Sequence, residues 1–349
     1  MANYSIPAKY FFMKAMNVEV IDTPPITNKT IELGTRYSPS TICTPFKYTL
    51  GSFIESLDLG AELLIQQGGG CKYGYYSEVQ EEILKDLGYK FKMLNLVNAG
   101  KMNIKHIYNT LKMIDSKLNI FKTIYYFINT RYIIKYMDLI DDYIRKNIGF
   151  EVNKGEFNSL NKSFLNNIIK KNNILSIKKC YKEYLSKFKK IKINKPINPI
   201  RVGIIGELYT IMEPFANYKL EELLASYKIE VTRFTNVEYL LFQKKKYMKK
   251  NLKLNKYVNY SMGADSSDNI CRCLELCENN FDGIIHIKST FCTPEISTIP
   301  ILNKVCKDYD IPIIYLSYDV NTGFTGIETR IDAFYDMMEA KREGTLFRS

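Results

Sequence analysis

The sequence has no tryptophan, only 2 histidines, and 8 cysteines among 349 residues. Eight cysteines are too few for a disulfide scaffold in a chain of this length. In a reducing compartment they serve as core residues, reactive thiols or metal ligands. The scarcity of histidine argues against a zinc site built from several imidazoles.

The sequence also lacks a long apolar run. Its most apolar stretch, residues 118–134, is interrupted by Lys122 and Arg131, so it is a poor candidate for a membrane span. The opening residues, MANYSIPAKYFF, do not form a basic region followed by an apolar one. We therefore expect a cytoplasmic protein with no membrane partner. A P-loop motif is absent, and Gly203-x-x-Gly206 alone is a weak indication of nucleotide binding.

Positive charge dominates overall, with a formal net charge of +12, but it is concentrated in one place. Residues 101–195 contain 21 Lys and Arg against 7 Asp and Glu, whereas the rest of the chain has 28 against 30. Lysines interleaved with Tyr and Phe can contact the phosphates of a nucleic acid. A solvated lysine face, or a docking face for an acidic protein partner, explains the same pattern, and without a recognisable binding motif nucleic acid is the weaker interpretation.

Periodicity divides the chain into three regions. Residues 1–97 alternate strands and helices, with strands expected at 18–21, 62–65 and 90–96 and helices around 46–57 and 79–87. Residues 98–197 are mostly helical in pattern and end at Pro196 and Pro199. Residues 198–349 return to α/β, with strands at 202–205, 230–232, 283–287 and 311–317 and helices at 270–277 and 327–338. The pattern predicts two α/β lobes with parallel sheets, joined by a helical segment.

The tripeptide Cys-Thr-Pro occurs twice, at Cys43 and at Cys292. Thr as N-cap and Pro at the first helical position predict that each tripeptide opens a helix. The positive end of the helix dipole then favours the thiolate of the preceding cysteine. Each cysteine is thus a candidate nucleophile or metal ligand, although a buried cysteine is often only a core residue.

A third cysteine, Cys71, follows Gly68, Gly69 and Gly70 after an expected strand. Glycines leave backbone N–H groups accessible, and Lys72 adds positive charge. All three cysteines fall at strand-to-helix junctions, where α/β proteins bind ligands. Three thiolates without a fourth protein ligand suit an iron–sulfur cubane with one open iron.

The remaining cysteines, the histidines and the glutamates near strand ends are interpreted mainly as structural residues. Cys273 and Cys277 share a core face of one helix, and Cys180 and Cys306 follow core spacing. The run from Cys271 to Cys277 lies within a single helix, which disfavours a metal site. His286 lies on an apolar strand and His106 in the basic region. Glu207, Glu213 and Glu295 lie near strand ends, and Glu207 and Glu295 are the candidates for proton transfer, with capping as the alternative.

Five segments carry a resemblance to a known family. They are PPITNKTIELGTRYSPSTICTPFKYTLGSFIESLDLGAE and GGGCKYGYYSEVQEEILKDLGY in the first lobe, and VGIIGELYTIMEPFANYKLEELL, FDGIIHIKSTFCTPEI and DYDIPIIYLSYDVNTGFTGIETRIDAF in the second. They resemble the 2-hydroxyacyl-CoA dehydratase-related iron–sulfur proteins, including those called CoA protein activases. The loop before Cys71 departs from the family pattern GGxGPCR, because Gly70 and Lys72 replace its Pro and Arg.

The resemblance implies flavodoxin-like lobes around an iron–sulfur cluster, either [4Fe-4S] or a double cubane shared across a dimer. It implies Cys43, Cys71 and Cys292 as cluster ligands, with Gly69 and Gly70 beside them. It also implies an ATP-dependent activator of actin-like fold as electron donor, and a homodimer or a heterodimer with a related subunit. The chemistry would be reduction or radical dehydration. Two alternatives stay open: a cluster scaffold without turnover, and a polyanion- or partner-binding module through residues 101–195.

Overall fold

The computed structural model describes residues 2–16, 18–96, 104–254, 256–258 and 260–344. The chain forms two compact units. The N-terminal unit consists of Asn3–Thr130 together with the short segment Ser289–Pro294, and the C-terminal unit of Arg131–Lys288 together with the chain from Glu295 onward. Cys292 therefore belongs to the N-terminal unit, although its neighbours along the chain on both sides belong to the other.

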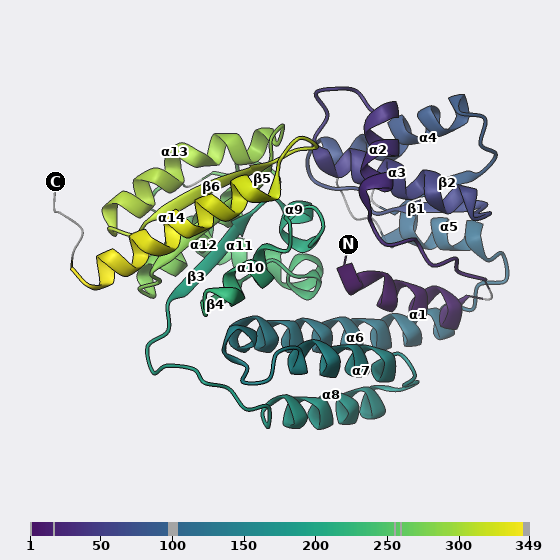
Figure 1. Cartoon of the computed structure of the whole chain (residues 1–349). Helices are drawn as coiled ribbons and strands as arrows, with labels where there is room; N and C mark the ends of the chain where they lie inside the picture. Colours follow the sequence, from purple (N-terminus) through teal and green to yellow (C-terminus); the bar gives the residue numbers. More distant parts are fainter. Residues whose placement is uncertain (1, 17, 97–103, 255, 259, 345–349) are drawn as a thin grey trace. The chain divides into compact units, whose positions relative to one another are not determined.

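The N-terminal unit is built on two parallel strands, β1 (Leu63–Gln66) and β2 (Lys92–Asn95), with Leu64 opposite Met93. Its helices α1 (Ser5–Ala15), α2 (Asn28–Tyr37), α3 (Thr44–Asp58), α4 (Tyr76–Asp86) and α5 (Ile104–Ile114) are labelled in Figure 1. Two short 3-10 helices are η1 (Ala2–Tyr4), which begins at a residue of the other unit, and η2 (Lys72–Tyr75). The predicted helices around 46–57 and 79–87 are confirmed as α3 and α4.

The strand predicted at residues 18–21 is wrong. These residues are irregular, and none of their side chains is buried. Pro24 and Pro25 follow closely, and proline removes the N–H donors that a strand needs. A short apolar alternation therefore makes no sheet here, although Val18 still packs against Ala15 and Met16.

Helices α2 and α3 cross with backbone against backbone. A Cβ on Gly34 would lie 1.8 Å from the Lys47 carbonyl oxygen, and one on Gly51 would lie 1.9 Å from the Thr30 carbonyl oxygen. The Thr30 hydroxyl donates a 2.6 Å hydrogen bond to Glu55 in the same buried crossing. Two small residues thus let α2 lie directly on α3, the helix that Cys43 opens.

The C-terminal unit contains a four-stranded sheet in the order β4-β3-β5-β6. The strands are β3 (Arg201–Gly206), β4 (Glu230–Arg233), β5 (Gly283–Ser289) and β6 (Ile313–Tyr318), and β3 runs parallel to both β4 and β5. All four strands match the predicted positions. The sheet order reverses direction between β3 and β5, which is the switch point where open α/β sheets bind ligands.

The C-terminal unit also contains helices of the basic region and helices that alternate with the strands of this sheet (Figure 1). They are α6 (Ile120–Asn147), which begins in the N-terminal unit, and then η3 (Ile148–Phe150), α7 (Glu156–Ile168), α8 (Ile174–Phe188), α9 (Leu208–Met212), α10 (Leu220–Ser226), η4 (Tyr239–Gln243), α11 (Lys244–Leu254), α12 (Ser266–Glu278), α13 (Thr293–Asp308) and α14 (Phe324–Arg342). The predicted helices at 270–277 and 327–338 are confirmed as α12 and α14. No described helix has both the length and the apolar character needed to cross a membrane.

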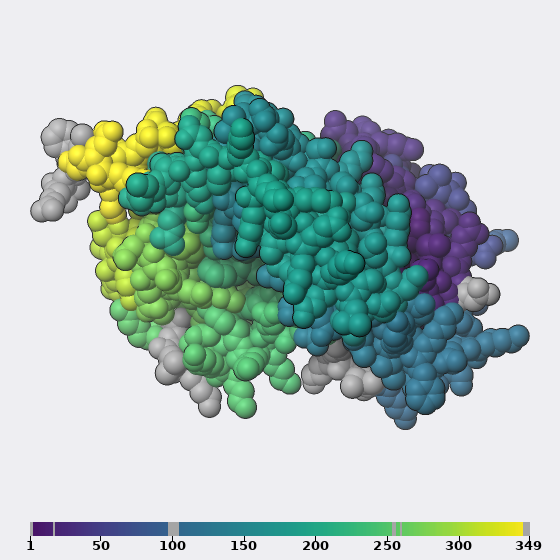
Figure 2. All heavy atoms as spheres, turned by 90° about the horizontal axis from the view of Figure 1, so that it is seen from below, coloured from purple at the N-terminus to yellow at the C-terminus, as the bar shows by residue number. Residues whose placement is uncertain are grey.

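The basic helices have one buried and one solvated face. Ile177, Cys180, Tyr184 and Phe188 are buried along α8. The lysines of α8 and of the turn after it are exposed at positions 178, 179, 182, 187, 189 and 190. Figure 2 shows atoms of this part of the chain, in teal, at the surface facing the viewer. These six lysines are therefore solvated, while the apolar face of α8 is buried.

Candidate functional site

Cys43 lies at the start of α3. It is the N-cap residue itself, with extended backbone (φ −64°, ψ 146°), so the helix begins at Thr44 and Pro45 lies in its first turn. The sequence prediction had placed the N-cap at Thr44, one residue later. The Cys43 side chain is buried, and its sulfur is hydrogen-bonded to the Tyr76 hydroxyl. The sulfur therefore lies at the positive end of the α3 dipole.

Cys71 has a comparable position in a more open place. It is the N-cap of η2 and exposed, and its sulfur accepts the Tyr73 N–H at 3.5 Å. A Cβ on Gly69 would meet the Tyr73 ring at 2.7 Å, whereas a Cβ on Gly70 would meet no atom within 4 Å. Gly69 therefore packs closely against the Tyr73 ring, whereas Gly70, next to Cys71, has open space beside it.

Tyr73 and Tyr76 each contact one of these two cysteines. The rings of Tyr73 and Tyr76 make an edge-to-face pair with centroids 4.8 Å apart. Tyr76 contacts the sulfur of Cys43, and the backbone of Tyr73 contacts the sulfur of Cys71. The aromatic pair therefore brings the Cys43 and Cys71 turns together on one side of the N-terminal unit.

Cys292 reaches the same unit through the segment Ser289–Pro294. Its N–H donates to the Ser289 carbonyl at 3.0 Å, and α13 begins one residue later, at Thr293. The Ser289 hydroxyl lies 2.9 Å from both the N–H and the hydroxyl of Thr44, 245 residues away in sequence. The two Cys-Thr-Pro tripeptides are thereby linked within one compact unit.

Cys43, Cys71 and Cys292 do not form a group whose ligand atoms lie within 4.8 Å of one another, so it is their donor chemistry that suits an iron–sulfur cluster. Three thiols beside helix starts are soft donors of the type that clusters require. At the end of β1, five residues before Cys71, the Gln66 side chain is 4% exposed and neither polar atom of its amide meets a partner among the described residues. Buried amides without partners are rare in proteins and point to a bound group. The assignment of Cys43, Cys71 and Cys292 as cluster ligands stays a prediction.

The predicted acid–base residues lie in the C-terminal unit, at the carboxyl ends of β3 and β5. Gly206 ends β3 with φ +136°, and a Cβ there would lie 1.8 Å from the Ile287 carbonyl, so only glycine fits. Asn269 pairs with both backbone groups of Gly206, at 3.0 and 3.1 Å, and donates to Glu295 Oε2 at 2.9 Å. Asn269 therefore connects the end of β3 to the first turn of α13.

Glu207 caps α9. Its carboxylate accepts the N–H groups of Tyr209 at 2.7 Å and Thr210 at 3.0 Å, together with the Thr210 hydroxyl. Burial raises the Glu207 pKa to about 7, although these hydrogen bonds oppose the increase. The capping alternative is therefore correct in geometry, and the raised pKa also suits proton transfer near neutral pH. Glu213 is buried and its carboxylate accepts the N–H of Phe215 at 3.2 Å.

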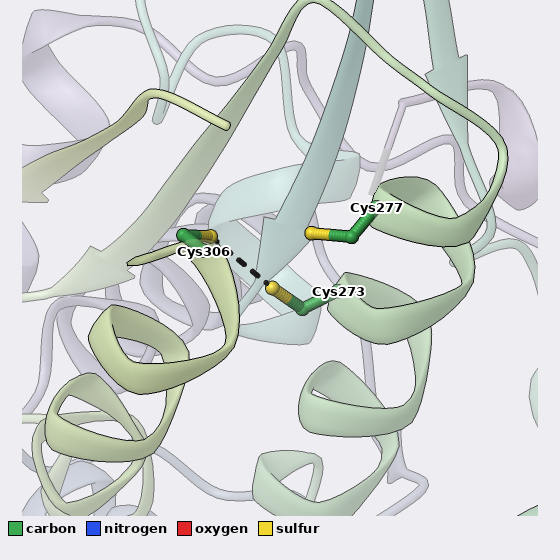
Figure 3. Close-up of side chains that lie close together, drawn as sticks. All are labelled: Cys273, Cys277 and Cys306. Carbon is green, nitrogen blue, oxygen red and sulfur yellow. Dashed lines mark hydrogen bonds between the residues drawn. The ribbon is translucent and has the colours of Figure 1, made fainter. Parts of the chain in front are cut away.

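The described residues also contain a group of three cysteines that sequence analysis did not assemble. The sulfurs of Cys273, Cys277 and Cys306 all lie within 4.8 Å of one another, and all three residues are buried. Figure 3 shows them converging from α12 and α13. Hydrogen bonds from Cys273 and Cys306 lower the Cys277 pKa.

The prediction that Cys273, Cys277 and Cys306 are core residues is confirmed, because all three belong to one apolar cluster. The sequence does not predict that these three sulfurs meet, because Cys306 lies on a different helix. Cys271, the third cysteine of the run on α12, is not part of the group. The i, i+4 spacing of Cys273 and Cys277 was the available signal. His286, on the apolar strand β5, is fully buried, and the Nε2 atom of His106 lies 2.8 Å from the Asn95 carbonyl oxygen.

Comparison with known proteins gives one family. Residues 233–338 match the family model HGD-D, described as 2-hydroxyglutaryl-CoA dehydratase, D-component. The match begins at the last residue of β4 and ends within α14, and it includes Cys292, Glu295 and the three buried cysteines. No curated protein sequence matches the chain. The match supports the expected relation to the 2-hydroxyacyl-CoA dehydratase-related proteins, because this part of the chain is similar to the D-component of 2-hydroxyglutaryl-CoA dehydratase.

Proposed function

We propose that the chain binds an iron–sulfur cluster through Cys43, Cys71 and Cys292 and uses it in reductive or radical dehydration chemistry. The proposal is carried by the link between the two Cys-Thr-Pro tripeptides, because the Thr44–Ser289 hydrogen bonds join positions 245 residues apart. Similarity of residues 233–338 to a 2-hydroxyglutaryl-CoA dehydratase component supports it. When bound, such a cluster supplies a low-potential electron.

The protein's own residues have separate roles in this proposal. The N–H of Tyr73 donates to the sulfur of Cys71, and the hydroxyl of Tyr76 is hydrogen-bonded to the sulfur of Cys43. Hydrogen bonds to cluster sulfurs tune the reduction potential. Glu207 and Glu295 position or transfer protons at the β3–β5 switch point. In the proposal an ATP-dependent activator is the electron donor, and the chain works as a homodimer or beside a related subunit.

The exposed lysines of α8 suggest how an acidic partner would dock. Lys178, Lys179 and Lys182 lie on its solvated face, opposite the buried Ile177 and Cys180. Clustered charge of one sign accelerates association with a partner of the opposite sign, and salt weakens the effect. Replacing the three lysines by glutamate should slow electron transfer from the activator at low salt. Retention on single-stranded DNA that is lost in the same variant would instead favour the polyanion-binding alternative.

The test of the proposal is an anaerobic purification with visible spectra and counts of iron and sulfide. A brown protein with about four irons per chain would indicate a single cubane. Serine substitution at Cys43, Cys71 or Cys292 should lower the iron content, whereas Cys180→Ser should not, since Cys180 is buried on α8. A colourless, iron-free protein after cluster reconstitution would overturn the proposal. A cluster that the activator and ATP do not reduce would identify a scaffold without turnover.

A further inference from the structure

The three buried cysteines form a site distinct from the proposed cluster. Cys273 and Cys277 are one turn apart on α12, and Cys306 faces them from α13 (Figure 3). Cys273 Sγ and Cys306 Sγ are 3.5 Å apart, and all three sulfurs lie within 4.8 Å of one another. An ion centred among sulfurs about 4 Å apart lies about 2.3 Å from each, which is the length of a metal–thiolate bond. The spacing therefore suits one ion held by three sulfurs.

The surroundings restrict the coordination number. The three side chains are 0–2% exposed and lie in a cluster that includes Ile270, Leu276, Ile284, Leu302 and Val305. Among the described residues, no carboxylate or imidazole completes the set within the same distance. Zinc prefers four ligands, and this interior offers neither a fourth side chain nor room for bulk water. The site is suited to an ion that is satisfied by three sulfurs.

Charge then selects the class of ion. A net charge in an apolar interior costs several kcal/mol, as an order of magnitude. Three thiolates leave a negative complex with a monovalent or divalent cation, but they neutralise a trivalent centre. We propose that Cys273, Cys277 and Cys306 bind a trivalent thiophilic centre of the arsenite type. Arsenous acid and three thiols form three As–S bonds and release three molecules of water, with no change in oxidation state.

Burial of the three sulfurs also determines how fast the trivalent centre binds and leaves. With all three sulfurs inside the core, the centre can enter only when α12 and α13 open locally, so binding and release should both be slow. A centre that bonds to both helices should then hold them together. Bound arsenite should therefore raise the melting temperature of the protein that carries it.

The experiment uses the full chain purified anaerobically and incubated with arsenite, and counts arsenic and iron in the same desalted sample. We expect one arsenic per chain, three sulfur neighbours by X-ray absorption, and unchanged iron. Replacing Cys273, Cys277 or Cys306 by Ser should weaken retention by roughly tenfold or more, because two sulfurs hold the centre less well than three. Cys271→Ser is the matched control, because Cys271 is buried on the same helix outside the triad.

Three outcomes would overturn the proposal. The first is arsenic retention in the three triad variants that equals that of the unmodified chain. The second is arsenic that is lost on replacing Cys43, Cys71 and Cys292, which would place it on the proposed cluster ligands instead. The third is tight binding of Cu(I) or Zn²⁺ by the triad without binding of arsenite, which would contradict the charge argument. If a serine variant is unstable, the number of sulfur neighbours and the rise in melting temperature of the unmodified chain still test the site.

Discussion

Glu295 and His286 share a hydrogen bond of 2.8 Å between Oε2 and Nε2, and their side chains are 1% and 0% exposed. The same oxygen accepts the Asn269 amide, which also holds Gly206. The pair thus fixes the first turn of α13 to the ends of β3 and β5. A buried carboxylate with two such partners is costly to alter.

The first prediction concerns this carboxylate. Glu295→Gln replaces the carboxylate that contacts Asn269 and His286 by a neutral amide, and neutral hydrogen bonds are weaker than charge-assisted ones, so we expect the free energy of unfolding to fall by about 1–3 kcal/mol. Denaturant titration measures it. Glu278→Gln is the control, because Glu278 is exposed at the end of α12. Equal stability of the two variants would contradict the role of Glu295 in holding the strand ends.

A second prediction concerns the link between the two tripeptides. Ser289→Ala removes the hydroxyl that lies 2.9 Å from both polar groups of Thr44. If the link positions Cys43 and Cys292 around a cluster, the variant should fold and yet lose iron faster under a chelator than the unmodified chain does. Ser176→Ala, at an exposed hydroxyl in the first turn of α8, is the control. Iron release at the same rate in both variants would argue against a cluster on these cysteines.

The glycine loop gives a third prediction. Gly70→Ala meets no described atom within 4 Å, so the melting temperature should change little. Because its methyl group would project into the space beside Cys71, iron content should fall if a cluster lies there. Gly69→Ala would instead push against the Tyr73 ring at 2.7 Å and should perturb folding around η2. Full iron content in Gly70→Ala would place the cluster away from this loop.

Glu207 gives a fourth prediction, about pH. Its folded pKa is raised to about 7 by burial, above the ordinary carboxyl value of 4.5. Between these two values the folded state binds a proton that the unfolded state does not, so this residue's contribution to stability is lost as pH rises through about 7. The free energy of unfolding cannot change by more than about 1.4 kcal/mol per pH unit through this one group. Partial exposure of Glu207 makes the change smaller.

Urea titrations of the unmodified chain and of Glu207→Gln from pH 5 to pH 8 measure this effect. The variant cannot ionise, so the stability difference between the two proteins should change with pH in the predicted direction. A constant difference would mean that Glu207 keeps an ordinary pKa. The loss of one capping hydrogen bond lowers stability equally at every pH and does not mimic the effect.

The crossing of α2 and α3 gives a fifth prediction. Gly34→Ala forces a Cβ to within 1.8 Å of a backbone oxygen, so the helices must separate, and we expect a loss of several kcal/mol of stability. Gly326→Ala is the contrast, because its Cβ meets nothing within 4 Å inside α14. Alanine there should stabilise by about 0.5–1 kcal/mol. Thermal unfolding followed by circular dichroism separates the two outcomes.

The sequence by itself determined the α/β class, the four strands of the C-terminal sheet and, to within one residue, the starts of the helices that follow Cys43 and Cys292. These features depend on local signals, namely apolar periodicity, Pro in the first helical turn and glycine after a strand. The strand predicted at residues 18–21 failed because a strand also needs a partner and a buried face, which local pattern does not reveal.

Only the tertiary structure decided which distant residues meet. It placed Ser289 beside Thr44, joined Glu295 to His286, and brought Cys306 to Cys273 and Cys277. Each contact joins different elements, so its formation depends on how helices pack on a sheet. Cysteine spacing along one helix predicted two of the three buried thiols on a shared face, but the third comes from α13. Local sequence sets the elements, and long-range packing sets the chemistry between them.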